Sequence, residues 1–119
     1  MEEKILPACF YQTELGKEPV RQWLKDLDKD DRLIIGADIK TVEFGWPIGM
    51  PTCRPLGKGL YEVRSNLSSN RIVHTIFCIH DRRMVLLHAF IKKTQKTPKQ
   101  DIELALDRKY KLEVEIDEK

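Results

Sequence analysis

The chain has few cysteines and no long apolar run. Its three cysteines are an odd number and contain no CxxC pair, so neither a disulfide framework nor a zinc site is expected. Cys9 and Cys78 lie in apolar strand contexts and are expected to be buried thiols. No apolar stretch approaches the about 18 residues of a membrane helix, and the N-terminus MEEKILPACFY has no apolar signal-peptide core. These features predict a protein of the reducing cytoplasm with no membrane partner.

Motifs for metals and nucleotides are also missing. Gly57-Lys58-Gly59 does not match a Walker motif, and no spacing typical of metal ligands occurs. A two-metal nuclease needs a cluster of carboxylates, but the strand-rich part of the chain contains only Glu62 and Asp81. We therefore expect no metal and no cofactor. If the protein cuts nucleic acid, the reaction must rely on basic residues and on positioning of the substrate.

Charge is nearly balanced in number but unevenly distributed. The chain has 21 Lys and Arg against 19 Asp and Glu, a net charge of +2. Acidic residues lie mostly in the N-terminal half and the C-terminal tail, whereas Lys and Arg dominate from Arg54 to Lys99. This asymmetry indicates an anionic partner. From charge alone, a solvated charged surface explains it equally well.

The pattern of apolar residues predicts one α+β domain over residues 1–119. Its sheet is rich in antiparallel pairs and consists of one N-terminal strand plus a three-stranded block, with two N-terminal helices and a C-terminal helix. Residues 48–59, with their prolines and glycines, are expected to form a loop. The expected strands are Ile5–Tyr11, at an edge because of Pro7, then Leu60–Ser65, Arg71–Ile79 and Met84–Ile91. The expected helix starts are Pro19 at the first helical position, Asp28 as a cap, and Thr97-Pro98-Lys99-Gln100 as a capping box.

Basic residues at the end of the three-stranded block suggest a phosphate site. Arg64 and Arg71 flank a short turn between neighbouring strands and are expected to approach one another, where two arginines can clamp a phosphate. The alternative is that Arg64 pairs with Glu62 or with a helix carboxylate. The turn Lys92-Lys93-Thr94-Gln95-Lys96 precedes a helix and adds positive charge. A lone strand histidine such as His88 is more often a hydrogen-bonded core residue than an acid or base.

The segments GLYEVR, RIVHTIF, VLLHAFIKKTQKTP and IELAL resemble the phage-derived, HigB-like branch of the RelE/ParE toxin superfamily. The resemblance covers nearly the whole chain and also includes GKEPVRQWL. It implies a RelE-like α+β toxin of a type II toxin–antitoxin pair, with a helix-turn-helix antitoxin, the ribosome and mRNA as partners. Many relatives are ribosome-dependent endoribonucleases that cut without metal, by attack of the RNA 2′-hydroxyl on the adjacent phosphate.

The same resemblance assigns roles to residues. Arg64 and Arg71 match positions that contact the scissile phosphate, and Lys93 matches a basic general acid or charge stabiliser. Further RNA contacts are expected from Lys58, Lys92, Lys96 and His88. RelE has a tyrosine near the start of its last helix, where this chain reads PKQDIEL, so the general base stays open between Lys96 and His88. Two other functions stay open, a ParE-like poison of DNA gyrase and an inert antitoxin-binding module.

Overall fold

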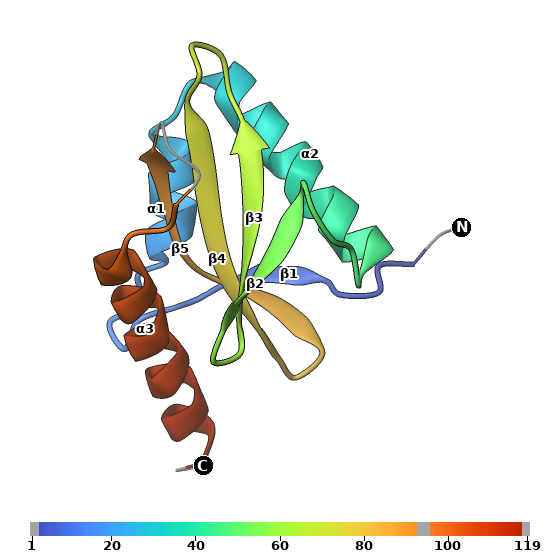
Figure 1. Cartoon of the computed structure of the whole chain (residues 1–119). Helices are drawn as coiled ribbons and strands as arrows, with labels where there is room; N and C mark the ends of the chain where they lie inside the picture. The colour runs from blue at the N-terminus through green and yellow to red at the C-terminus, as the bar shows by residue number, and fades with distance from the viewer. Residues whose placement is uncertain (1–2, 93–95, 118–119) are drawn as a thin grey trace.

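The computed structural model describes residues 3–92 and 96–117, with side chains to 114. Within these residues, five strands form one sheet in the order β1-β5-β4-β3-β2 (Figure 1). β1 runs parallel to β5, and the other neighbours are antiparallel. This confirms the predicted α+β fold with an antiparallel-rich sheet. The elements are β1 Ala8–Phe10, α1 Pro19–Lys25, α2 Lys29–Gly45, β2 Cys53–Gly57, β3 Leu60–Asn66, β4 Ile72–His80, β5 Arg83–Lys92 and α3 Lys99–Asp117.

Helices cover both faces of the sheet, because strand side chains alternate between two apolar cores. Val20 of α1 and Ile35 of α2 share one core with strand residues such as Phe77. Ala105 of α3 packs in the second core with strand residues such as Ile76. Figure 1 shows α2 and α3 at opposite flanks of the sheet. The face beneath α3 is the one that carries the candidate site.

Strand β2 corrects the expectation of a loop over residues 48–59. Cys53, Arg54 and Pro55 pair with Val63, Glu62 and Tyr61 of β3. Proline has no N–H to donate, but the outer edge of an edge strand needs no donor, so Pro55 is compatible with this position. The strand matters for function because it places Arg54 directly beside Glu62.

The helix starts agree with the sequence except at α3. α1 begins at Pro19, and Asp28 precedes α2, although its side chain makes no capping hydrogen bond. The predicted capping box at Thr97 is wrong. The Thr97 hydroxyl donates to the carboxylate of Glu62, and α3 begins two residues later, at Lys99. A capping threonine accepts a hydrogen bond from a backbone N–H of the first helical turn, whereas the Thr97 oxygen here accepts from Arg54 Nη2 at 2.9 Å.

All three cysteines are free thiols, and the prediction of burial holds for Cys78 but only in part for Cys9. Cys53 is also buried. Burial raises the pKa of both Cys53 and Cys78 to about 11. No helix in the described part of the chain is long and apolar enough to cross a membrane.

Candidate functional site

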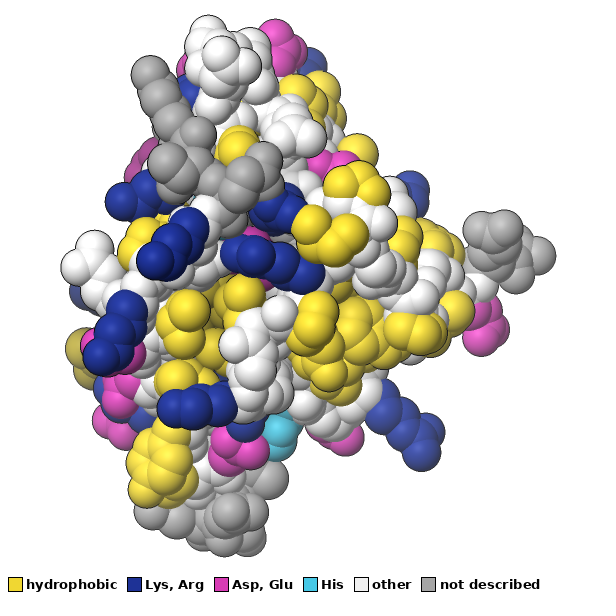
Figure 2. All heavy atoms as spheres, viewed as in Figure 1, with side chains coloured by type: hydrophobic (Ala, Val, Ile, Leu, Met, Phe, Trp, Pro, Cys, Tyr) yellow, Lys and Arg dark blue, Asp and Glu magenta, His cyan; other side chains and the backbone are white. Residues whose placement is uncertain are grey.

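Basic side chains gather on the sheet face beneath the start of α3. Figure 2 shows Lys and Arg side chains near the middle of this view, over the strands and beside the start of α3. Cross-strand pairing explains the cluster, because Arg54 lies opposite Glu62, and Arg64 lies opposite His74. Paired residues on neighbouring strands point to the same face, with Cβ atoms about 5 Å apart. The strand register therefore brings Arg54, Glu62, Arg64 and His74 together.

Arg64 has no carboxylate partner among the described residues. Its Nη2 donates to the Sδ of Met50 at 3.4 Å, and thioether sulfur is a weak acceptor. Its Nε is buried and has no acceptor in the described part of the chain. A buried N–H without an acceptor is costly, by about 1–3 kcal/mol. An anion such as phosphate would satisfy this guanidinium with charge-assisted hydrogen bonds.

A buried polar network lies directly behind this arginine. Glu62 is fully buried, and its Oε1 accepts a hydrogen bond from Arg54 Nε at 3.1 Å. Its Oε2 accepts from Thr97 and lies 3.0 Å from His74 Nδ1. Arg54 Nη2 also donates to Thr97 Oγ1 at 2.9 Å. Three strands and the segment before α3 thus meet at one carboxylate.

The network keeps Glu62 ionised. Burial alone would raise the pKa of the Glu62 carboxyl, but hydrogen bonds from His74 and Thr97 and the charges of His74 and Arg54 lower it below its ordinary value. The resulting negative charge fixes the Arg54 guanidinium, whose side chain remains 29% exposed. Arg54 is therefore a positioned, partly accessible cation next to Arg64. Sequence reasoning did not identify Arg54 as a site residue.

Arg71 does not join this cluster, which corrects the expected arginine clamp. Its Nη1 and Nη2 donate to the two carboxylate oxygens of Asp31 at 3.0 and 3.2 Å. Its Nε donates to the carbonyl of Ser68 at 3.0 Å. Asp31 belongs to α2, on the face opposite α3, so alternation along the strands separates Arg71 from Arg64. Arg71 fastens the turn between β3 and β4 to α2.

The predicted lysines are distributed unequally around Arg64. Lys92 pairs with Ile72, which places it on the same face as His74 and one step beyond the Arg64–His74 pair. Lys92 and Lys96 are exposed. Lys58 lies in the turn at the other end of β3, about 20 Å from Arg64 at roughly 3.4 Å per residue. Lys93, together with Thr94 and Gln95, lies outside the described residues.

His88 is held by contacts on the β5 side of the same face. Its Nε2 lies 2.7 Å from Asp101 Oδ1, and its ring stacks on Phe90 at 5.4 Å between centroids. It also lines a cavity of about 200 Å³ with Trp23 and Arg108. These contacts match the packed, hydrogen-bonded histidine of the sequence analysis. They do not bring His88 to Arg64.

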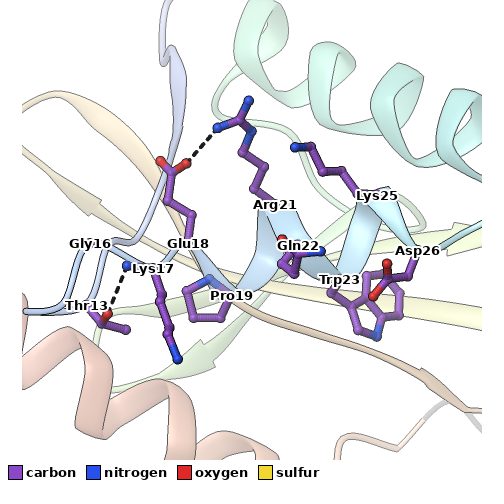
Figure 3. Close-up of a pocket in the computed structure, with 10 residues that line it drawn as sticks. All are labelled: Thr13, Gly16, Lys17, Glu18, Pro19, Arg21, Gln22, Trp23, Lys25 and Asp26. Atoms are coloured by element: carbon purple, nitrogen blue, oxygen red, sulfur yellow. Dashed lines mark hydrogen bonds and ion pairs between the residues drawn. The ribbon is translucent and has the colours of Figure 1, made fainter.

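The cavity around α1 does not form a second reactive cluster. A cavity of about 710 Å³ surrounds α1, but its side chains diverge, with Arg21 and Lys17 on different sides of the helix (Figure 3). Arg21 already pairs with Glu18 at 3.1 Å. No group of three His, Cys, Asp or Glu that could hold a metal ion occurs within residues 3–92 and 96–117.

The sheet with α1 and α2 on one face and α3 on the other has the fold of RelE-like toxins. The model of the family "Phage derived protein Gp49-like (DUF891)" matches residues 22–110. The chain therefore belongs to this phage-derived family, which is part of the RelE/ParE-like toxin family. The match includes Arg54, Glu62 and Arg64. A comparison with curated proteins found no match.

Proposed function

We propose that this protein is the toxin of a type II toxin–antitoxin pair, in the HigB-like branch, and that it cuts mRNA on the ribosome in the cytoplasm. The observation that carries the proposal is Arg64, whose buried Nε has no acceptor among the described residues and which lies beside the positioned Arg54. A structural arginine has its donors satisfied, as Arg71 does. Arg64 instead has donors available for an anion, which supports a phosphate-binding role.

In the proposed reaction the RNA 2′-hydroxyl attacks the adjacent phosphorus. The 2′-O–P bond forms and the P–O5′ bond breaks. The attacking 2′-hydroxyl loses its proton and the departing O5′ gains one, which leaves a 2′,3′-cyclic phosphate and a 5′-hydroxyl. Arg64 and Arg54 neutralise the charge that builds on the phosphoryl oxygens, and this is the kind of preorganised electrostatic stabilisation that lowers barriers most. Lys92 and Lys96 add positive charge and bind the flanking backbone. The ribosome supplies further positioning of the mRNA.

The proposed partner is a helix-turn-helix antitoxin. A toxin with an accessible cationic cluster must be kept inactive until its antitoxin releases it. Acidic side chains of an antitoxin are suited to cover Arg64. Coexpression with the product of the neighbouring gene, followed by pull-down, should recover a stoichiometric complex. Failure of the two proteins to associate would argue against the toxin assignment.

The test of the reaction uses pre-formed ribosome–mRNA complexes. We expect cleavage of ribosome-bound mRNA, little cleavage of free RNA, and a 2′,3′-cyclic or 3′-phosphate at the product end. Primer extension on transcripts after induction in bacteria should show matching cuts. A 3′-hydroxyl with a 5′-phosphate would refute this mechanism, and a DNA damage response without mRNA cleavage would favour a gyrase poison instead.

A further inference from the structure

A cavity of about 390 Å³ opens beside the edge strand β2. The loop after α2 lines it with Trp46, Ile48 and Gly49, and the strands line it with Cys53, Arg54 and Tyr61. Its volume lies within the range of about 300–1,000 Å³ that is common for small-ligand pockets. Figure 2 shows hydrophobic side chains gathered over β2 and the preceding loop, directly next to the basic cluster.

Two aromatic rings line this cavity. The rings of Trp46 and Tyr61 meet edge to face, with centroids 5.0 Å apart. Tyr61 stacks in turn on the buried Phe77 at 5.5 Å, so its ring is held in place. Both Trp46 and Tyr61 are only half-buried, and the Tyr61 hydroxyl has no hydrogen-bond partner among the described residues. The lining therefore offers two fixed aromatic rings, set nearly at right angles to each other, and one polar group.

The rest of the lining is uncharged except at one side. The Cys53 thiol stays protonated at neutral pH, because burial and the nearby Glu62 charge raise its pKa to about 11. Arg54 lines the cavity and also contacts Glu62 and Thr97 in the buried network. Trp46, Cys53 and Tyr61 pack with the core on the α2 face, whereas Arg64 lies on the α3 face, so the cavity and the cationic cluster meet around the edge strand β2. There Arg54 borders the cavity, and Met50, which follows the lining residue Gly49, contacts Arg64. A ligand suited to both has a flat apolar part joined to an anionic part.

We propose that this cavity binds the nucleobase adjacent to the phosphate held by Arg64, and we call it the base pocket. The proposal rests on the proposed function and names the part of the RNA that this site recognises. Proteins that bind single-stranded RNA combine a basic track for the backbone with aromatic side chains that stack on bases. The Tyr61 hydroxyl is available to hydrogen-bond the base edge.

Gly49→Leu is the variant that tests the base pocket. A Cβ at Gly49 has no atom within 4 Å, and its backbone is not in the left-handed region, so a larger side chain fits there and occupies the cavity wall. Gly36→Leu is the matched control, because a Cβ at Gly36 on the exposed surface of α2 also meets no atom within 4 Å. Tyr61→Phe provides a second test, since it removes the hydroxyl and keeps the stacked ring. Tyr61→Phe should also slow cleavage, by a smaller factor than Gly49→Leu. It becomes the deciding variant if Gly49→Leu lowers the melting temperature.

The assay measures cleavage of two synthetic mRNAs on the ribosome. The first is intact, and the second lacks one base beside the cut while keeping its 2′-hydroxyl and phosphates; both neighbouring positions are tested in turn. We expect the wild-type protein to cut one abasic mRNA about 10- to 100-fold more slowly, the factor expected for one stacked base. Gly49→Leu should show a similar loss on intact mRNA and little further loss on that abasic mRNA. Gly36→Leu should behave like the wild type on both.

Three results would overturn the base pocket. If Gly49→Leu cuts intact mRNA at the wild-type rate, no base occupies the cavity. The same holds if removing the base slows cleavage by Gly49→Leu as much as it slows cleavage by the wild type. If Gly49→Leu loses binding of the antitoxin while cleavage is unchanged, a peptide is the occupant. If the wild-type protein cuts no ribosome-bound mRNA, the proposed function fails and the base pocket with it. The first two results leave the proposed function standing.

Discussion

Glu62→Gln is the substitution whose effect follows most directly from the structure. The fully buried carboxylate accepts from Arg54 and Thr97 and lies against His74. The amide has nearly the same shape, but it carries no charge and turns an N–H₂ donor toward other donors. Disrupting one partner of a buried ion pair costs about 3–5 kcal/mol, and here Arg54, Thr97 and His74 all lose their charged partner. At about 4 °C per kcal/mol for a chain of this size, the melting temperature should fall by about 12–20 °C.

Thermal unfolding followed by circular dichroism measures this effect, with Glu113→Gln as the matched control. Glu113 accepts from Lys109 on the surface of α3 at 3.0 Å and is 49% exposed. Exposed ion pairs contribute about 1 kcal/mol or less, so the control should melt within about 4 °C of the wild type. Equal melting temperatures for the two variants would refute the view that the Glu62 network stabilises the fold.

The same comparison has a defined pH dependence. The folded pKa of Glu62 is lowered, so the unfolded chain takes up this proton at a higher pH than the folded chain does. The stability from Glu62 is therefore present above the ordinary glutamate pKa of about 4.3 and is lost as the pH falls through the folded pKa. The difference between the wild type and Glu62→Gln should shrink below about pH 4. A difference that stays constant down to pH 2 would contradict this explanation.

Three further outcomes are expected. Arg64→Ala should abolish growth inhibition and mRNA cleavage without lowering the melting temperature by more than a few degrees, and a variant that unfolds or stays active would reject the assignment. Asp31→Asn should destabilise the protein by about 1–3 kcal/mol in urea unfolding, since it breaks the bidentate contact with Arg71; unchanged stability would instead return Arg71 to the RNA site. With a small thiol reagent at pH 8, Cys9 should react before the two buried cysteines, and an equal rate for all three would contradict their burial.

The sequence predicts the elements that have a clear period. Pro19 marks the start of α1, and the alternating apolar residues locate β3, β4 and β5 within a few residues. β2 could not be recognised, because a five-residue strand with Pro55 and Gly57 has the composition of a turn. Its strand conformation depends on pairing with β3, and this pairing is a tertiary interaction.

The site was predicted in part. Arg64 lies on an accessible face as expected, but Arg71 was assigned to the same cluster because its distance along the chain is short. Alternation places the two arginines on opposite faces, so the short distance was misleading. The partners of Glu62 come from β2, β4 and the segment before α3, and no local pattern links them. A single glutamate inside an apolar strand was the one available signal.

The pairing of β1 with β5 sets a condition on when the sheet can be completed. Ala8 of β1 pairs with Met84 of β5, so one edge of the sheet joins the beginning of the chain to a strand near its end. Contacts between residues so distant in sequence form slowly, since a long loop must close first. During synthesis, β1 therefore stays unpaired until β5 has left the ribosome. A chain whose β5 is still inside the ribosome therefore lacks the completed sheet, and the ribosome that makes it meets only an unfinished fold.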